Sequence, residues 1–347
     1  MGARMACASD AGFGCLVKRF DVVIAGEANM DLLLYGLPEA LPADRELLAE
    51  GMQFVLGGSS AITAHNLAAL GNRVGFLALA ADDAFARFWR AELENAGVDL
   101  SHVVAARAGI TTGVSVLLQH AQSRRIFTWP GTTAALRLAD LDLDSIASAQ
   151  HFHLSSYFLQ RDLRADVPVL LRSCKEQGLT VSLDPNDDPA GEWGHDLLDL
   201  LGCVDVLMPN EHETCRLAGD SDLERAIETL RRKVPLLVVK RGLQGAVAIR
   251  GEQRVAMPAC SVACVDAVGA GDSFNAGFLH GYLRGWDLER CVRLGNCSGA
   301  FSTTGVGGTQ AFRDRAALAQ FLERHGETEV LAEVASAVPS RRTGNGR

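Results

Sequence analysis

The sequence predicts an α/β fold in which a doubly wound, mostly parallel central sheet carries a small β-sheet lid. Short apolar runs rich in β-branched residues recur along the chain, and several are continuous rather than alternating, as in strands buried on both faces. Helical patterns lie between them, as in βαβ units whose right-handed crossovers cover both faces of a sheet. With 347 residues, 48% of them hydrophobic, the chain can form one large domain and a small appendage.

The strands of the central sheet are expected where the apolar runs occur. Their ranges are Asp21–Ala25, Val74–Leu79, His151–Leu154, Leu179–Leu183, Val204–Met208, Leu236–Lys240 and Ala246–Ile249. Helices are expected at Ser60–Leu70, Asp83–Asn95, Arg164–Gln177, Asp222–Arg232, Asp272–Leu283, Asp287–Phe301 and Arg313–Arg324. The first helix closes at Gly71, a typical glycine stop, and the second ends before Gly97.

Two stretches interrupt this alternation and predict a second, smaller sheet. Leu32–Leu56 contains two prolines, and Gly113–Trp129 holds two β-type runs around a polar bend, with no helical pattern between them. Both neighbour segments with site-like chemistry, so we interpret them as a lid, the alternative being a decorative hairpin. The lid would comprise residues 32–56 and 113–129, and the α/β domain residues 20–31, 57–112 and 130–325.

Composition and the chain ends exclude several classes of function. The net charge is −9 without a basic stripe, so no nucleic-acid partner is expected. No apolar run reaches the roughly 18 residues that a membrane span needs, and residues 1–19 do not resemble a secretory signal. The nine cysteines are scattered and odd in number, which favours free thiols in a reducing cytoplasm. Residues 1–19 are expected to be disordered, and residues 326–347 to be a partly disordered tail.

The strongest chemical signal is the run Gly269-Ala270-Gly271-Asp272, which directly precedes a helical pattern. Glycines at a first helical turn expose backbone N–H groups, and such a turn favours an anion. A carboxylate beside it could take a proton from a hydroxyl, which is what phosphoryl transfer to an alcohol requires. The alternative is that Asp272 only caps the helix, and the local pattern leaves both interpretations open.

Two motifs resemble the signatures of the ribokinase (PfkB-type) carbohydrate kinase family. Residues 266–278, which read DAVGAGDSFNAGF, resemble its C-terminal signature. Gly57-Gly58-Ser59-Ser60-Ala61, followed by HNLAALG at residues 65–71, resembles its N-terminal signature. The two stand in the family's order and far apart, and the likeness covers roughly Phe20 to Leu322.

The resemblance implies an enzyme that transfers the γ-phosphoryl group of ATP to a hydroxymethyl group, usually of a sugar. It implies a doubly wound sheet with a β lid, ATP and Mg²⁺ as cofactors, and a homodimer formed through lid strands. Asp272 would be the catalytic base. The N–H groups of Gly269, Ala270 and Gly271 would form the anion hole for the transferred phosphoryl group.

The resemblance also assigns residues to the acceptor. Asn29 and Asp31, after the first strand, would hold the sugar hydroxyls, and Gly57 and Gly58 would let the backbone approach it. Ile62 stands where the family often has an asparagine, which argues against ribose itself.

On the nucleotide side, Asn210 would face the phosphates and Glu213 would hold Mg²⁺ through water. The turn containing Lys240, Gly242 and Gly245 resembles the family's nucleotide-binding turn. Asn296 and the run Thr303–Gly308 would line the adenine pocket. Asp266 and Val268 stand where a monovalent cation, K⁺, would bind in many relatives.

Two other functions stay open at this point. One is a nucleoside kinase of the same family, for which Phe54 and Trp129 would supply lid aromatics. The other is a catalytically silent sugar- or nucleotide-binding regulator, against which the intact Asp272 and its glycines argue. A carboxylated or phosphorylated acceptor is disfavoured because Asp188 replaces the arginine of some sugar-acid kinases, although Arg124 and Arg125 lie on the lid.

Overall fold

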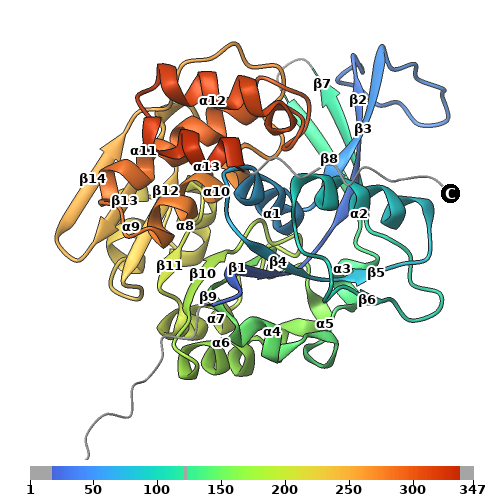
Figure 1. Cartoon of the computed structure of the whole chain (residues 1–347). Coiled ribbons are helices and arrows are strands. Elements are labelled where there is room, and N and C mark those ends of the chain that lie inside the picture. Colours follow the sequence, from blue (N-terminus) through green and yellow to red (C-terminus); the bar gives the residue numbers. More distant parts are fainter. Residues whose placement is uncertain (1–17, 121–122, 337–347) are drawn as a thin grey trace, which may run out of the picture.

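The computed structural model describes residues 18–120 and 123–336, and its centre is an eight-stranded sheet (Figure 1). The strand order is β14-β13-β12-β11-β10-β9-β1-β4. The strands are β1 (Phe20–Ala25), β4 (Val74–Leu77), β9 (Ala149–Ser155), β10 (Thr180–Asp184), β11 (Val206–Leu207), β12 (Leu236–Lys240), β13 (Ala246–Arg250) and β14 (Gln253–Met257). Pairing is parallel from β4 to β12 and antiparallel from β12 to β14. The chain winds outward from β1 in both directions, which confirms the doubly wound, mostly parallel sheet.

Helices cover both faces of this sheet, because alternate residues of its strands point to opposite sides. Val22 and Ile24 of β1 pack in one apolar cluster, whereas Val23 and Ala25 pack in the other. The first cluster includes α1 (Ser59–Ala69), α2 (Ala84–Ala96), α10 (Ala270–Leu283), α11 (Leu288–Ser302), α12 (Arg315–Arg324) and α13 (Leu331–Ser336). The second includes α4 (Leu143–Ala147), α5 (Arg161–Arg164), α6 (Val167–Glu176), α7 (His195–Leu200), α8 (Glu211–Ala218) and α9 (Leu223–Leu230).

A separate four-stranded sheet stands beside the α/β domain, at the upper right of Figure 1. Its order is β3-β2-β7-β8, with β2 (Asn29–Tyr35), β3 (Gly51–Gly57), β7 (Val114–His120) and β8 (Ser123–Trp129). One face holds a small apolar cluster of Leu33, Val55, Leu117 and Val268. Val268 belongs to the segment before α10, so this cluster joins the small sheet to the predicted anion-binding turn. The described residues also form α3 (Thr132–Ala135), a two-stranded sheet of β5 (Leu79–Ala80) and β6 (Val104–Ala105), and five 3₁₀ helices of three residues each.

The predicted elements occur where expected, with a few instructive differences. The run Val74–Leu79 divides into β4 and β5. The helix predicted at Arg164–Gln177 is α6, which begins only at Val167 with Pro168 in its first turn, after the short α5 has ended at Arg164. Several short elements were not predicted. They are the edge strand β14, whose side chains are mostly exposed, the strand β6, and the helices α3, α4, α7, α8 and α13. Val330 and Val334 of the expected tail are buried in the core, whereas residues 1–17 and 337–347 lie outside the described residues. Among the described residues, no helix has the length and apolar character that a membrane span requires.

Candidate active site

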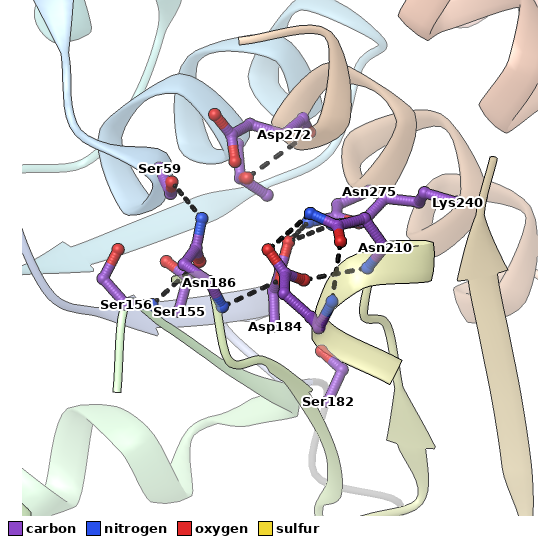
Figure 2. A network of polar contacts seen from close by, with 12 residues as sticks. Ser59, Ser155, Ser156, Ser182, Asp184, Asn186, Asn210, Lys240, Asp272 and Asn275 are labelled. Atoms are coloured by element: carbon purple, nitrogen blue, oxygen red, sulfur yellow. Dashed lines mark hydrogen bonds and ion pairs between the residues drawn. The ribbon is translucent and has the colours of Figure 1, made fainter. Parts of the chain in front are cut away.

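The candidate site lies where several parallel strands end and α10 begins (Figure 2). Figure 2 shows Asp184 and Asn186 from the end of β10, Ser155 and Ser156 from the end of β9, and Asp272 from α10. Side chains at the carboxyl ends of neighbouring parallel strands converge beside the point where the winding reverses. Here that reversal lies at β1, which has β4 on one side and β9 on the other.

Asp272 is buried in the first turn of α10 and does not cap that helix. The N-cap is Gly269, and no described side chain makes a capping hydrogen bond there. The capping interpretation of Asp272 is therefore wrong. Burial, and next the charge of Asp184, raise the pKa of Asp272 to about 7, although Lys240 and a hydrogen bond from Ser59 oppose this rise. A carboxyl group that titrates near neutral pH is well suited to proton transfer.

The glycines before Asp272 bring the backbone close to a second glycine-rich segment and to a cation. Gly269 has a φ of 73°, and a Cβ at this position would lie 2.5 Å from the Cα of Gly308. A Cβ on Gly271 would lie 3.6 Å from the Nζ of Lys240. The N–H of Ala270 donates to the carbonyl of Ala267 at 3.3 Å, whereas those of Gly269 and Gly271 precede the first backbone hydrogen bond of α10, from Ser273 to Gly269. An anion at this turn would therefore meet N–H donors and the Lys240 ammonium.

Lys240 forms a buried ion pair with Asp184, and both residues come from strand ends. The Asp184 side chain is fully buried and also accepts a hydrogen bond from the Nδ2 of Asn275 at 2.6 Å. Burial lowers the pKa of Lys240, but the carboxylates of Asp184 and Glu213 outweigh this effect and raise it. Lys240 is therefore a cation at neutral pH, held between three acidic groups that include Asp272.

A second hydrogen-bonded chain supports Asp272 from the other side. The Nδ2 of Asn186 donates to the Oγ of Ser59 at 2.8 Å, which leaves the Ser59 hydroxyl hydrogen free to donate to Asp272. Asn186 Oδ1 in turn accepts from the backbone N–H of Ser156 at 3.0 Å. Asn186 and Ser156 both have positive φ values, 54° and 53°, which are unusual for residues other than glycine. Such strained residues persist where their surroundings fix them, and they gather at functional sites.

The residues predicted to hold the acceptor lie together at the start of β2. Asn29 and Asp31 are buried, and the Oδ1 of Asn29 accepts from the hydroxyl of Thr133 at 2.9 Å. Burial, and next the charge of Asp266, raise the pKa of Asp31 to about 7, against the lowering effect of Arg124. A side chain at Gly57 would collide with the Asp31 carboxylate, so glycine is required there. Gly58 is the N-cap residue of α1.

Asn210 and Glu213 cap α8 reciprocally. The N–H of Glu213 donates to Asn210 Oδ1 at 2.9 Å, and the N–H of Asn210 donates to Glu213 Oε2 at 2.8 Å. Asn210 Nδ2 also donates to Glu213 Oε1 at 2.6 Å, so both oxygens of this carboxylate are engaged. Burial, and next the charge of Asp184, raise the pKa of Glu213 to about 7. Among the described residues, no group of three or more His, Cys, Asp or Glu side chains could hold a metal ion.

The other predicted nucleotide residues lie in the turn after β12 and within α11. Gly242 and Gly245 bound the turn between β12 and β13. The Nδ2 of Asn296 donates to the carbonyls of Met257 and Pro258, at 3.1 and 3.0 Å, and so holds the segment that follows β14.

Asp266 accepts from the N–H groups of Val268 and Gly307, at 3.0 and 2.9 Å, and from Gln119 of the small sheet at 3.4 Å. The two residues predicted for the monovalent cation therefore connect the small sheet to the segment before α10.

Sequence reasoning missed four residues of the site: Ser59, Asp184, Asn186 and Asn275. The signal that could have identified them is their position in the sequence. Asp184 and Asn186 follow a predicted strand, Ser59 follows the Gly57-Gly58 pair, and Asn275 lies one helical turn after Gly271. The clustering of three carboxyl groups with a pKa raised to about 7 is itself typical of functional sites.

Comparison with known proteins is consistent with this geometry. A family model described as pfkB family carbohydrate kinase matches residues 19–315. An ATP-dependent ribose-1-phosphate kinase of Halopiger xanaduensis is 32% identical over 309 residues, covering 87% of this chain and 97% of that protein. A nucleoside kinase of Methanothermobacter thermautotrophicus is 27% identical over 282 residues, covering 81% of this chain and 88% of that protein. The crystal structure of a putative ribokinase II from E. coli with ATP and Mg²⁺ superposes with a TM-score of 0.76 at 24% identity, over 88% of this chain and all of that one, and shares the fold.

Proposed function

We propose that this chain, which belongs to the pfkB family of carbohydrate kinases, transfers the γ-phosphoryl group of ATP to a hydroxymethyl group of a small sugar or sugar derivative. One observation carries the proposal: a buried carboxyl group, Asp272, lies in the first turn of α10 without capping it. Its neighbours are the backbone of the glycine turn, in which the Ala270 N–H also donates to the Ala267 carbonyl, and the Lys240 ammonium. A base beside an anion site is the minimum that phosphoryl transfer to an alcohol needs.

In the proposed reaction Asp272 accepts the proton of the acceptor hydroxyl, and the hydroxyl oxygen attacks the γ-phosphorus. The bond between this phosphorus and the bridging oxygen of ATP breaks, and ADP leaves. The N–H groups of Gly269, Ala270 and Gly271 and the charge of Lys240 stabilise the negative charge of the transferred group. Asn210, Gly242, Gly245 and Asn296 would hold the nucleotide. Mg²⁺ bound to ATP supplies charge neutralisation, and Glu213 would hold it through water. K⁺ would bind beside Asp266 and Val268.

The acceptor would lie between Asp272 and the small sheet, which serves as its lid. Asn29 and Asp31 are buried at the start of β2, where their oxygen and nitrogen atoms could bind hydroxyl groups. Asp31 also lies near Asp266, which belongs to the segment that leads to the proposed anion-binding turn. Asp188 accepts hydrogen bonds from the N–H groups of Ala190, Glu192 and Trp193, so its role there is structural. The relative named as a ribose-1-phosphate kinase makes sugar phosphates worth testing, with Arg124 near Asp31 as the available cation.

A nucleoside kinase is the second candidate, favoured by the relative named as a nucleoside kinase. The two aromatic residues expected to support it do not lie on the acceptor side. Phe54 pairs with Leu32 and Trp129 with Val114, whereas Asp31 pairs with Val55 and Ser115, so both aromatics are on the opposite face of the lid. Adding nucleosides to an acceptor assay decides between the two candidates.

Glu213→Gln is expected to raise the Mg²⁺ concentration that gives half-maximal activity by about tenfold, as for other groups that act on a metal indirectly. The glutamine oxygen can still accept from the Asn210 N–H and so keep the capping box, whereas the hydrogen bond from Asn210 Nδ2 is lost. We therefore expect the fold to persist with a small loss of stability. The measurement is initial rate against Mg²⁺ at saturating ATP. Glu211→Gln is the control, because Glu211 pairs with Arg241 and takes no part in the capping box. An unchanged Mg²⁺ dependence for Glu213→Gln would remove the residue from the metal site.

We also propose a homodimer formed through the lid. The lid face opposite Asp31 exposes Met52, Phe54, Phe127 and Trp129, with 36% to 63% of each side chain accessible. Leu32, Leu34, Val116 and Leu118 are half-buried on the same face. A continuous apolar surface of this kind marks an interaction site.

Phe127→Asp is expected to convert a dimer into a monomer, because it places a charge at the centre of this face. Sedimentation equilibrium at micromolar concentrations measures the change. The control is Val169→Asp on α6, where the original side chain is exposed to a similar extent, 50% against 57% for Phe127. A wild-type protein that is monomeric at these concentrations would contradict the proposal.

A further inference from the structure

Cys260 and Cys297 bring two thiols together beside the proposed nucleotide site. Their Sγ atoms are 3.0 Å apart, although 37 residues separate them in the chain. Cys260 lies half-buried on the segment after β14, and Cys297 is buried within α11. Within the described part of the chain, no other two cysteine sulfurs come within hydrogen-bonding range of each other. The prediction of scattered free thiols did not include such a pair.

The chemistry of the pair favours oxidation. A disulfide needs an S–S distance of about 2 Å, so closure requires an approach of about 1 Å. The contact with Cys297 lowers the pKa of the Cys260 thiol below its ordinary value, which favours its thiolate form. The thiolate is the reactive form, and the partial exposure of Cys260 gives an oxidant access to it.

We propose that Cys260 and Cys297 form a redox-sensitive dithiol that closes to an intramolecular disulfide and thereby weakens nucleotide binding. Hydrogen peroxide is the oxidant considered. The Cys260 thiolate attacks its O–O bond, which breaks to leave a sulfenic acid on Cys260 and release hydroxide. The Cys297 thiol then attacks the sulfenic sulfur, forms the S–S bond and releases water. In total two thiols and one peroxide yield one disulfide and two waters, and a dithiol reductant reverses the change.

The link to nucleotide binding rests on the proposed function, through the residue next to Cys297. Asn296 holds the carbonyls of Met257 and Pro258, three and two residues before Cys260. Closing the disulfide therefore pulls on the same segment that Asn296 positions. The other cysteine, Cys297, lies on α11, whose close packing in the core leaves it little room to move. A displacement of about 1 Å in a binding site is enough to lower the affinity for a ligand substantially.

The test uses the full chain, reduced and then treated with limiting hydrogen peroxide, with thiol mapping by alkylation and mass spectrometry. The expected product is a Cys260–Cys297 disulfide that dithiothreitol removes. Cys264→Ser, which changes an exposed thiol of the same segment, should leave this product intact, whereas Cys297→Ala should abolish it. A link from Cys260 to any other cysteine, or oxidation of Cys260 to sulfinic acid without a link, would overturn the proposal.

The second readout is ADP affinity by calorimetry for the reduced and oxidised forms. At least threefold weaker binding by the oxidised form is expected, with no difference in Cys297→Ala. Equal affinity in the two wild-type forms would overturn the coupling to the nucleotide. A reduced protein that binds no ADP would instead contradict the proposed function, and the disulfide map would still stand.

Discussion

Asp272→Asn should reduce kcat by about 10²–10⁴-fold, because it removes the base without changing the shape of the site. The same substitution should stabilise the protein at pH 8. The folded-state pKa of Asp272, about 7, lies above the ordinary value of 3.8, so the folded protein binds this proton more tightly than the unfolded chain does. Its contribution to stability therefore falls as the pH rises from about 4 to about 7 and stays low above that.

The size of this effect follows from the two pKa values. They differ by about 3, which corresponds to at most about 4 kcal/mol. Asparagine also alters the hydrogen bond from Ser59, so we expect a gain of about 2 kcal/mol, measurable as a Tm increase of a few degrees. The gain should vanish below about pH 4, where the carboxyl group is protonated in both states.

Asp188→Asn is the matched control, since it neutralises another buried aspartate. The Asp188 carboxylate accepts three backbone hydrogen bonds, so this change should lower Tm and leave kcat within a few fold. An Asp272→Asn protein with full activity would remove Asp272 from the reaction. One that is inactive but strongly destabilised would show that Asp272 serves the fold.

Lys240→Met should destabilise the protein by about 3–5 kcal/mol, because it leaves the fully buried Asp184 without its cation. Asp184→Asn should cost less, since Lys240 keeps Glu213 and Asp272 as nearby opposite charges. The double variant should recover most of the stability lost in Lys240→Met, because no isolated charge remains. It should not recover activity, because the cation that faces Gly271 is gone.

Urea unfolding of the wild type, both single variants and the double variant gives the interaction energy between the two residues. The expected interaction free energy exceeds about 2 kcal/mol, because each substitution removes the charge that compensates the other residue. A Lys240→Met protein as stable as the wild type would show that water can stabilise the Asp184 carboxylate in place of the Lys240 ammonium. An active double variant would exclude Lys240 from stabilising the transferred phosphoryl group.

Local patterns predicted those parts of the molecule that depend on neighbours in sequence. The continuous apolar runs located β1 and β12 because a strand buried on both faces has few polar positions. Glycines before a helix located the turn at the start of α10, because the positive φ of Gly269 is a conformation that glycine adopts readily. The resemblance to the family's two signatures added that Gly57–Ala61 and residues 266–278, which are far apart in the sequence, belong to one site.

Contacts between distant strands could not be predicted in the same way. Asp184 and Lys240 are 56 residues apart, and their ion pair depends on both strands ending at the same edge of the sheet. Asn186 reaches Ser59 across 127 residues, with a positive φ of 54° that the local sequence does not specify. Strand β14 escaped prediction because its exposed side chains give no apolar pattern. Such features depend on register and tertiary packing rather than on local preference.

The central claim is that this chain phosphorylates a small hydroxyl-bearing acceptor at the expense of ATP. The most direct test incubates the purified protein with ATP, Mg²⁺ and a panel of sugars, sugar phosphates, sugar acids and nucleosides. ADP and the phosphorylated acceptor are then quantified together by mass spectrometry. We predict that at least one acceptor yields ADP and its phosphate ester in equal amounts, and that Asp272→Asn yields neither at a comparable rate. ADP release without an esterified product, or no acceptor-dependent ADP across the panel, would contradict the account.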